Sequence, residues 1–450
     1  MDENKHAQNE QDSEFSFVTE TIKNRPPNTK RIISRVILTL ICAVLFGLVA
    51  SLVIAVALPK IQARLQPEPE PEVHRVVIPA DEYETETETE QPVTEETEEP
   101  ETETETEPET ETEMPETEGQ EIPEAQVVEL LPEEYQKLQN RLYDIGEEAN
   151  RAIVTVTTLT SDTDWFNATY SSESKESGLI VANTGEEVLI LTDYAPVRAA
   201  EHITVTFIND DICDAEVKTY DGVTGLVVLS VKASALKEDT AAAIKPADLG
   251  NSLSMRKGTM ILALGSPLGT NFSILTGTLT QTGDTIFLAD AVFRVFETDV
   301  VAANSGNGVL VDLNGSVVGY VRKETASDDT LSAISISDLK PLIEKLSNGM
   351  EVPYLGIYMS TVTKEIAEQY ELPQGAYINS VEMDSPAMDA TLLSGDVIVE
   401  ADGKPILTAE NYRSALMEHT PGEEMRVVVE RLGADGYTKV SCTARVGVKE

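Results

Sequence analysis

The spacing of apolar residues changes several times along the chain, and each change marks a different kind of segment. Val36–Leu58 is a continuous apolar run without a charged residue. At about 1.5 Å rise per residue it is long enough to span the roughly 30 Å hydrocarbon core of a bilayer as a helix. Basic residues precede the run, which predicts a cytoplasmic N-terminus and an extracytoplasmic remainder of the chain. A cleaved signal peptide ending near Ala55–Ala57 is the alternative. A retained anchor is favoured because the apolar part of a signal peptide covers only about 7–15 residues.

From Ile153 onward, apolar and polar residues alternate, so the hydrophobic pattern has a period of two residues. About a dozen short runs rich in β-branched residues follow, separated by turn residues, up to Arg322. Such a series, with no helical pattern between its members, predicts an all-β barrel or a pair of sandwiched sheets. Apolar residues at helical spacing predict one helix before this block, Leu130–Ala149, and one after it, Ser337–Leu346.

After Pro353 the pattern changes again. Strand-like runs alternate with the helical runs Thr363–Tyr370 and Ala409–His419. This alternation predicts an α+β domain of ordinary size over residues 351–450.

Two segments have a composition that cannot form a hydrophobic core. Residues 1–35 are polar and are predicted to be a disordered cytoplasmic tail. Residues 59–125 are rich in Glu, Thr and Pro, and they supply about half of the net charge of -46. Their like charges repel one another, so this stretch is predicted to be an extended, disordered spacer. The acidic balance argues against binding of nucleic acid, which requires a basic surface.

Cysteine and histidine are scarce. Cys42, Cys213 and Cys442 are far apart and form no metal-ligand pattern, so buried free thiols are expected. A bridge between Cys213 and Cys442 remains open on spacing alone. No cofactor and no metal site is expected from the sequence.

Several short motifs occur in one order between Ser177 and Thr298. They are a Ser-Gly-x-Ile strand, two turns that contain glycine, and a Thr-Gly strand. In this order they cover Ser177–Ile180, Leu249–Ser252, Ala263–Gly269 and Thr276–Leu279, and the segment Thr298–Asp312 follows them. In this order and spacing, the chain resembles the HtrA/Deg family of trypsin-like serine proteases that carry a PDZ domain. The resemblance covers about 151–450. It implies a mainly β, chymotrypsin-like double β-barrel over 126–350, followed by an α+β PDZ domain over 351–450. The apolar run adds an N-terminal transmembrane helix at 36–58 to this fold.

The same resemblance assigns the three catalytic positions to residues without catalytic chemistry. Ala195 occupies the position of the family's histidine, and Gly225 occupies the position of its acid. When the sequences are aligned on Val309–Val311, Gly306 occupies the position of the catalytic serine. A serine protease needs a histidine against the nucleophile and an acid that orients it. Alignment on the Asn-Ser-Gly triplet instead keeps Ser305 as the nearest hydroxyl.

The four histidines of the chain offer no obvious replacement base. His202 is the only one in the β-rich block, and it is expected to be an exposed residue at a strand end; the others are His6, His74 and His419. A serine without a positioned base is a poor nucleophile at neutral pH. A dyad of Ser305 with Lys232 or Lys323 is conceivable, but nothing in the sequence selects either lysine. The hypothesis from the sequence is therefore a pseudoprotease, with an active endopeptidase that uses a non-standard site at Ser305 as the alternative.

The second domain contains motifs of a peptide-binding module. Tyr354, Leu355, Gly356 and Ile357 resemble the carboxylate-binding loop of a PDZ domain, where successive backbone N–H groups receive a terminal carboxylate and the next strand pairs with the peptide. Tyr412 and Leu416, on the helical run, would line the groove with Ile357 and Met359. Ordinary core packing is the competing interpretation for these four side chains.

Together these features predict an HtrA-like protein of the cell membrane, with a cytoplasmic N-terminus and extracytoplasmic domains. Its PDZ domain would bind peptides or C-termini of exported proteins, in envelope protein quality control. In the family, aromatic residues in this N-terminal region support trimer contacts, so Trp165 and Phe166 are candidates for a homotrimer; a partly buried loop anchor is the alternative.

Overall fold

The computed structural model describes residues 37–48, 75–81, 131–163, 169–301, 303, 306–322 and 330–449. The chain divides into two units, Met1–Val73 and His74–Glu450. In the first unit, residues 37–48 form a helix. No helix among the described residues is both long enough and apolar enough to cross a membrane. Residues 36 and 49–58 of the predicted span, like the predicted tail at 1–35, lie outside the described residues.

The second unit begins its regular structure with a helix, α2 (Pro132–Asn150). Pro132 stands in its first turn, where a missing N–H costs nothing. The predicted helix is thus confirmed, and of its apolar positions Leu142 is buried, whereas Leu138 is exposed.

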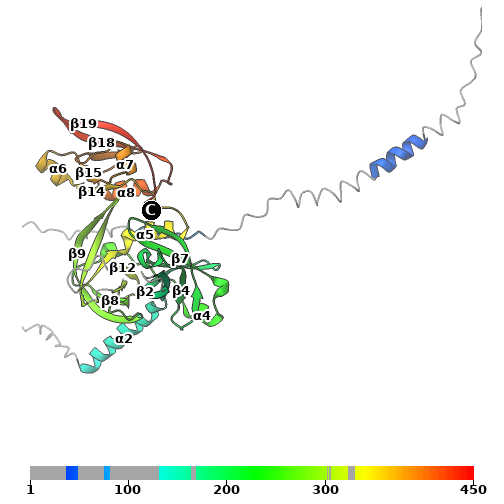
Figure 1. Ribbon diagram of the computed structural model, residues 1–450, viewed down its shortest axis with the longest axis horizontal. Coiled ribbons are helices and arrows are strands. Elements are labelled where there is room, and N and C mark those ends of the chain that lie inside the picture. The colour runs from blue at the N-terminus through cyan, green and yellow to red at the C-terminus, as the bar shows by residue number, and fades with distance from the viewer. Residues whose placement is uncertain are drawn as a thin grey trace, which may run out of the picture. The chain divides into compact units, whose positions relative to one another are not determined.

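The β-rich block forms two sheets, as the period-two pattern predicts (Figure 1). The first has seven strands in the order β5-β4-β1-β2-β3-β7-β6. Their bounds are β1 (Ile153–Thr163), β2 (Thr169–Asn183), β3 (Glu187–Asp193), β4 (His202–Thr206), β5 (Ile212–Asp214), β6 (Glu216–Asp221) and β7 (Leu226–Lys232). Neighbouring strands are antiparallel throughout.

The second sheet is a closed barrel of six strands in the order β10-β13-β12-β11-β8-β9. Its strands are β8 (Met260–Ser266), β9 (Ser273–Leu288), β10 (Ala291–Val301), β11 (Asn307–Val311), β12 (Val317–Val321) and β13 (Thr330–Ser335). β9 and β10 are the longest of these, and they form a hairpin in which Ala291 pairs with Leu288. The turn of this hairpin is therefore only Ala289 and Asp290.

Helices interrupt the β-rich block, contrary to the expectation from the sequence. α3 (Tyr194–Val197) and α4 (Glu238–Ala243) are single short turns, and η1 (Ala233–Ala235) and η2 (Ser252–Ser254) are 3-10 turns. None is long enough to show a helical period, so the pattern could not reveal them. The closing helix α5 (Ile336–Ser347) confirms the predicted one, and it packs on the cores of both sheets through Leu339, Leu342 and Ile343.

The C-terminal part folds around its own sheet, as predicted. Its strands follow the order β14-β15-β16-β18-β19, with β17 paired to β16. The elements are β14 (Ile357–Val362), α6 (Lys364–Tyr370), β15 (Gly375–Val381), α7 (Pro386–Asp389), β16 (Val397–Ala401), β17 (Lys404–Pro405), α8 (Ala409–Met417), β18 (Glu424–Gly433) and β19 (Gly436–Arg445). Its apolar core is separate from the cores of the preceding sheets.

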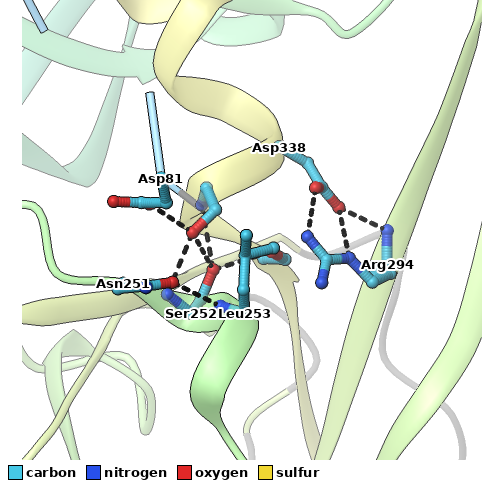
Figure 2. Close-up of polar contacts among 8 residues, drawn as sticks. Asp81, Asn251, Ser252, Leu253, Arg294 and Asp338 are labelled. Carbon is cyan, nitrogen blue, oxygen red and sulfur yellow. Dashed lines mark hydrogen bonds and ion pairs between the residues drawn. The ribbon is translucent and has the colours of Figure 1, made fainter. Parts of the chain in front are cut away.

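One part of the predicted spacer is ordered. Residues 75–81 lie along α5, where the backbone of Val76 exchanges hydrogen bonds with the Asn348 side chain and the Ile78 N–H donates to Glu344. Lys340 Nζ lies 2.6 Å from the Asp81 carboxylate, and both side chains are largely buried. Figure 2 shows Asp81 beside the start of α5.

The prediction of a uniformly disordered spacer over 59–125 is therefore corrected at residues 75–81. Here the Glu/Thr repeat is replaced by apolar residues that pack on the core of the sheets, including Val76 and Ile78. Burial of such side chains outweighs the cost of ordering a short segment. The remainder of the spacer lies outside the described residues.

The three cysteines are free. Cys213 and Cys442 are buried in different cores, so they behave as small apolar side chains and form no bridge with each other. Cys42, expected to be buried, is exposed.

Candidate functional site

The fold brings together the two segments that carry the predicted histidine and acid positions. Ala195 lies in α3, directly after β3, and Gly225 ends the turn before β7. The Tyr194 N–H donates to the Gly225 carbonyl oxygen at 2.8 Å. The alignment of these positions is therefore consistent with the fold, yet Ala195 is exposed and neither residue has a group that could move a proton.

An arginine fills the space beside the vacant acid position. The Arg322 Nε lies 3.6 Å from Asp193 Oδ1, and both side chains are largely buried. A Cβ placed on Gly225 would lie 3.3 Å from the Arg322 guanidinium, and the backbone there has φ +67°. A larger residue at position 225 would thus meet both a strained backbone and a buried cation.

The neighbourhood of α3 is structured rather than open. The Tyr194 ring stacks on Tyr220, with ring centroids 4.1 Å apart. The Asp221 carboxylate accepts hydrogen bonds from the Val223 and Thr224 N–H groups and from the Thr224 hydroxyl. Asp221 therefore holds the turn that ends at Gly225.

The nucleophile segment approaches the same place. Thr192 Oγ1 donates to the Ser177 carbonyl oxygen at 3.1 Å, and the Ser177 N–H donates to Asn307 Oδ1 at 3.2 Å. Through Ser177, the end of β3 is thus linked to the start of β11.

At Gly306 itself there is no room for a side chain. A Cβ there would lie 2.4 Å from the Pro267 carbonyl oxygen. The Gly306 N–H donates to the Ala303 oxygen at 2.8 Å, and the Ala303 N–H donates to the Pro267 oxygen at 2.9 Å. In a trypsin-like site the N–H group of the serine position points into the oxyanion hole, and at Gly306 this group is used within the loop. Ser305 lies outside the described residues.

The other candidate bases have partners of their own. His202 begins β4 as predicted, with its side chain 55% exposed and its Nε2 3.2 Å from Asp214. Lys232 pairs with Glu216 and is also exposed. His419 contacts Asp402 and Glu423 in the C-terminal domain, and Lys323 lies outside the described residues.

The predicted carboxylate-binding loop has the geometry that such a loop requires. Gly356 has φ +88°, in the left-handed region that favours glycine, and a Cβ there would lie 2.6 Å from the Ser385 Cβ. The Tyr354 hydroxyl donates to Glu382 at 2.6 Å, and the Tyr354 backbone pairs with Gly447. These contacts hold the loop so that the N–H groups of the three residues after Tyr354 converge.

These N–H groups converge on a carboxylate of the chain itself. The Leu355 and Gly356 N–H groups donate to Asp290 Oδ2 at 2.7 and 2.6 Å, and the Ile357 N–H donates to Oδ1 at 3.1 Å. The Tyr412 hydroxyl donates to Oδ1 at 2.9 Å. The tip of the β9–β10 hairpin thus places a carboxylate in the loop that was predicted to receive one from a peptide.

Burial and hydrogen bonding oppose each other at Asp290. Burial is the larger effect and raises the pKa of the carboxyl group to about 6, although the four hydrogen bonds favour the ionised form. Burial, and then the neighbouring Asp290 charge, raise the pKa of the Tyr412 phenol, which keeps it a donor. The carboxylate is therefore held by neutral donors at a desolvation cost.

The four side chains predicted to line the groove are all buried in the core of the C-terminal domain. Ile357, Met359, Tyr412 and Leu416 are each 0–1% exposed. Their burial fits the core-packing interpretation in this structure. In addition, the Tyr412 hydroxyl and the Ile357 backbone N–H donate hydrogen bonds to Asp290.

Two residues were missed by reasoning from the sequence. Asp290 lies in an ordinary Leu-Ala-Asp-Ala turn, and Arg322 follows a strand; neither stands in a recognisable motif. Their partners are distant along the chain, so no local signal could have identified them.

Two family models match the chain. The trypsin-like peptidase domain model matches residues 176–319, and the PDZ domain model matches residues 353–441. The fold and these matches define a trypsin-like peptidase domain followed by a PDZ domain.

Several curated proteins named as serine proteases are similar to this chain. Over 284 residues the chain is 30% identical to the serine protease Do-like HtrB of Bacillus subtilis (strain 168), a match that covers 57% of this chain and 59% of that protein. It is 27% identical over 333 residues to the serine protease Do-like HtrA of the same organism, covering 67% of this chain and 72% of that protein. The putative serine protease HhoB of Synechocystis is 30% identical over 273 residues, with 57% and 63% covered. The chain thus spans less than two thirds of the length of HtrB and of HhoB.

Among solved structures, an HtrA-type protease AlgW with a tripeptide matches 69% of this chain and 97% of its own, at 25% identity and a TM-score of 0.49. With a TM-score below 0.5, this likeness adds nothing to the assignment. The two domains in this order and the curated relatives suffice: the chain belongs to the HtrA/Deg-like family.

Proposed function

We propose that this protein is an HtrA-like pseudoprotease, which holds peptides or protein C-termini through its PDZ domain without cutting them. One observation carries the proposal. The positions that the resemblance assigns to the histidine and the acid are Ala195 and Gly225, and they lie on adjoining segments, with 2.8 Å between Tyr194 N and the Gly225 oxygen. A trypsin-like mechanism needs a base at the first and an orienting acid at the second.

The nucleophile segment supports the same conclusion. Gly306 has no space for a serine side chain, since its Cβ would lie 2.4 Å from the Pro267 oxygen. The Gly306 and Ala303 N–H groups are engaged within the loop. The Gly306 N–H is the group that would stabilise the oxyanion if Gly306 holds the serine position, and in this loop it donates to Ala303 instead.

Peptide binding is supported by the loop of the PDZ domain. Its N–H groups converge on one point and already hold a carboxylate there, so the chemistry of terminal carboxylate capture is present. The ligands would be peptides or C-termini of exported proteins.

The location of these ligands follows from the proposed membrane arrangement. Two relatives in other bacteria carry the name probable periplasmic serine endoprotease DegP-like. We assign this chain a similar place, with 36–58 as a membrane anchor, the N-terminus in the cytoplasm and the two domains outside. A homotrimer through Trp165 and Phe166 remains part of the proposal, and these two residues lie outside the described residues.

Catalysis is tested by incubating the full-length protein with unfolded casein and with a fluorophosphonate probe. We expect neither casein fragments nor labelling, while an active trypsin-like protease in parallel gives both. Labelling that disappears in Ser305→Ala would establish the alternative, a serine endopeptidase that uses Ser305 without the usual triad.

Peptide binding is tested with a library of peptides that carry a free C-terminal carboxylate. The full-length protein is expected to select a C-terminal consensus. Amidation of the selected peptides should abolish binding, because the loop then has no carboxylate to hold. Equal binding of the amidated peptides would remove the proposed role of the loop.

A further inference from the structure

The turn of the β9–β10 hairpin is buried, although a hairpin turn is ordinarily a surface feature. Ala289 and Asp290 are each only 5% exposed. The strands that carry them are rooted in the barrel, where β9 pairs with β8 and β10 pairs with β13. At its far end the hairpin contacts the PDZ domain, since β9 and β10 both contact β14, and β10 also contacts α8.

The hydrogen bonds of Asp290 reproduce those of a terminal peptide residue. Its carboxylate accepts from the three loop N–H groups, and its own backbone N–H donates to the Ile357 carbonyl oxygen at 2.7 Å. A peptide that adds a strand to β14 would need the same donors for its terminal carboxylate and the same carbonyl for its last N–H. Asp290 and a peptide terminus therefore cannot occupy the loop together.

Side chains around the turn hold it in this position. Val292 packs against the core of the PDZ domain. The Arg413 guanidinium, on α8, lies 4.0 Å from the centroid of the Phe293 ring, which belongs to the core of the sheets. The hydrogen bonds of Asp290 to the loop are thus part of a larger contact between the β9–β10 hairpin and the PDZ domain.

The occupant is also a strong competitor, because it is attached to the same chain. An intramolecular ligand acts at an effective concentration on the order of millimolar or higher. The apparent dissociation constant of an external peptide equals its intrinsic value divided by the fraction of molecules in which the loop is free. A loop that is free in one molecule in a hundred would weaken peptide binding about a hundredfold.

We propose that Asp290 is an internal ligand of the PDZ domain, a carboxylate that fills the peptide-binding loop in the resting protein and must leave before a C-terminal peptide can bind. This inference rests on the proposed peptide-binding function and adds its regulation. The peptide is recognised by its free carboxylate, and anything that draws the β9–β10 hairpin away from α8 and β14 would switch binding on.

The test compares the full-length protein with Asp290→Ala and with a matched control, Asp284→Ala. Asp284 is on the same hairpin, also carries a carboxylate and is exposed. The probe is a pool of fluorescein-labelled decapeptides, randomised over the last four positions and ending in a free carboxylate. Fluorescence anisotropy should show about tenfold or greater tightening in Asp290→Ala and no change in Asp284→Ala. The affinity for the amidated pool should be the same in Asp290→Ala and in the wild type.

A second measurement separates this inference from the proposed function. Hydrogen exchange of the Leu355, Gly356 and Ile357 amides is followed without peptide, in the wild type and in Asp290→Asn, which keeps the size of the side chain. The same exchange is measured in Asp290→Ala. Faster exchange is expected in both variants, because Asp290→Ala removes the acceptor and Asp290→Asn replaces one of its two acceptor oxygens by an NH2 group.

The outcomes are distinct. Equal peptide affinity in the wild type and Asp290→Ala, with unchanged exchange, overturns the internal ligand and leaves peptide binding intact. Binding by none of the variants overturns the peptide-binding function, and faster loop exchange in the same samples would still establish that Asp290 occupies the loop. If Asp290→Ala fails to fold, the anisotropy comparison is made with Asp290→Asn and judged by the same criteria.

Discussion

The trypsin-like site and the PDZ loop differ in how they depart from a working site. At the first, the proposed catalytic positions are Ala195, Gly225 and Gly306, whose residue types carry no catalytic group, and a Cβ at Gly306 would lie 2.4 Å from the Pro267 oxygen. At the second, every donor remains, but the site is filled by Asp290. A missing side chain cannot be restored by a conformational change, whereas an internal ligand can leave. On the proposed function, regulation of this protein would therefore act on the PDZ loop.

Tyr412→Ala is expected to have the largest effect on the stability of the PDZ domain and of its loop. This side chain is fully buried in the PDZ core and donates to Asp290. Its removal leaves a cavity and should lower the free energy of unfolding by about 4 kcal/mol, measured by urea denaturation.

Tyr412→Phe is the control for the hydroxyl alone. It keeps the ring and removes only the hydrogen bond to Asp290, so about 1–2 kcal/mol is expected. A loss in Tyr412→Phe as large as in Tyr412→Ala would mean that the hydroxyl, rather than packing, dominates at this position.

Gly356→Ala should have the next largest effect. The methyl group would lie 2.6 Å from the Ser385 Cβ at φ +88°, so contact and backbone strain add, and we expect about 2–3 kcal/mol of destabilisation in thermal unfolding. Gly403→Ala is the matched control, since Gly403 has φ +80° with no atom within 4 Å of its Cβ position; about 1 kcal/mol is expected there. Equal losses at the two sites would show that the loop yields to the added methyl group.

Acidification should increase the contribution of Asp290 to the stability of the folded protein. The pKa of this carboxyl group is raised from 3.8 to about 6 in the folded protein, so its protonated form is favoured by folding. Its contribution to stability is then fully present below about pH 4 and is lost as the pH rises through about 6, a change of roughly 2–3 kcal/mol.

The measurement is the difference in free energy of unfolding between the wild type and Asp290→Asn across pH 4.5–7.5. Subtraction removes the titration of groups that do not interact with Asp290. The groups that face it, Tyr354, Tyr412 and Arg413, have pKa values above this pH range. A difference that does not vary with pH would place the carboxyl group outside the buried site in solution.

The smallest effect is expected from rebuilding the catalytic residues. The triple variant Ala195→His, Gly225→Asp and Gly306→Ser should remain without measurable casein hydrolysis. Gly225 lies at φ +67° beside Arg322, and Gly306 is closed by Pro267, so the new side chains cannot reach a catalytic arrangement. Appreciable hydrolysis by this variant would show that only the side chains, and not the loop, separate this site from an active one.

Much of the fold was predictable because its signals are local. The period-two runs indicate the strands of both sheets, and the helical patterns around Leu142 and Leu339 indicate α2 and α5. The short helices α3 and α4 were missed because single turns have no period. The ordered stretch at 75–81 was missed because the surrounding Glu/Thr repeat dominates the composition of that region.

The chemical groups that this protein has can be read from its amino-acid sequence alone. Alanine and glycine at positions 195 and 225, and the Tyr-Leu-Gly-Ile loop at 354–357, are visible without a structure. Only the tertiary structure decided that the loop is occupied, because Asp290 lies 65 residues before Leu355 and 122 before Tyr412. A hairpin turn shows in the sequence where the chain reverses, but what its tip contacts depends on how the barrel and the PDZ domain pack.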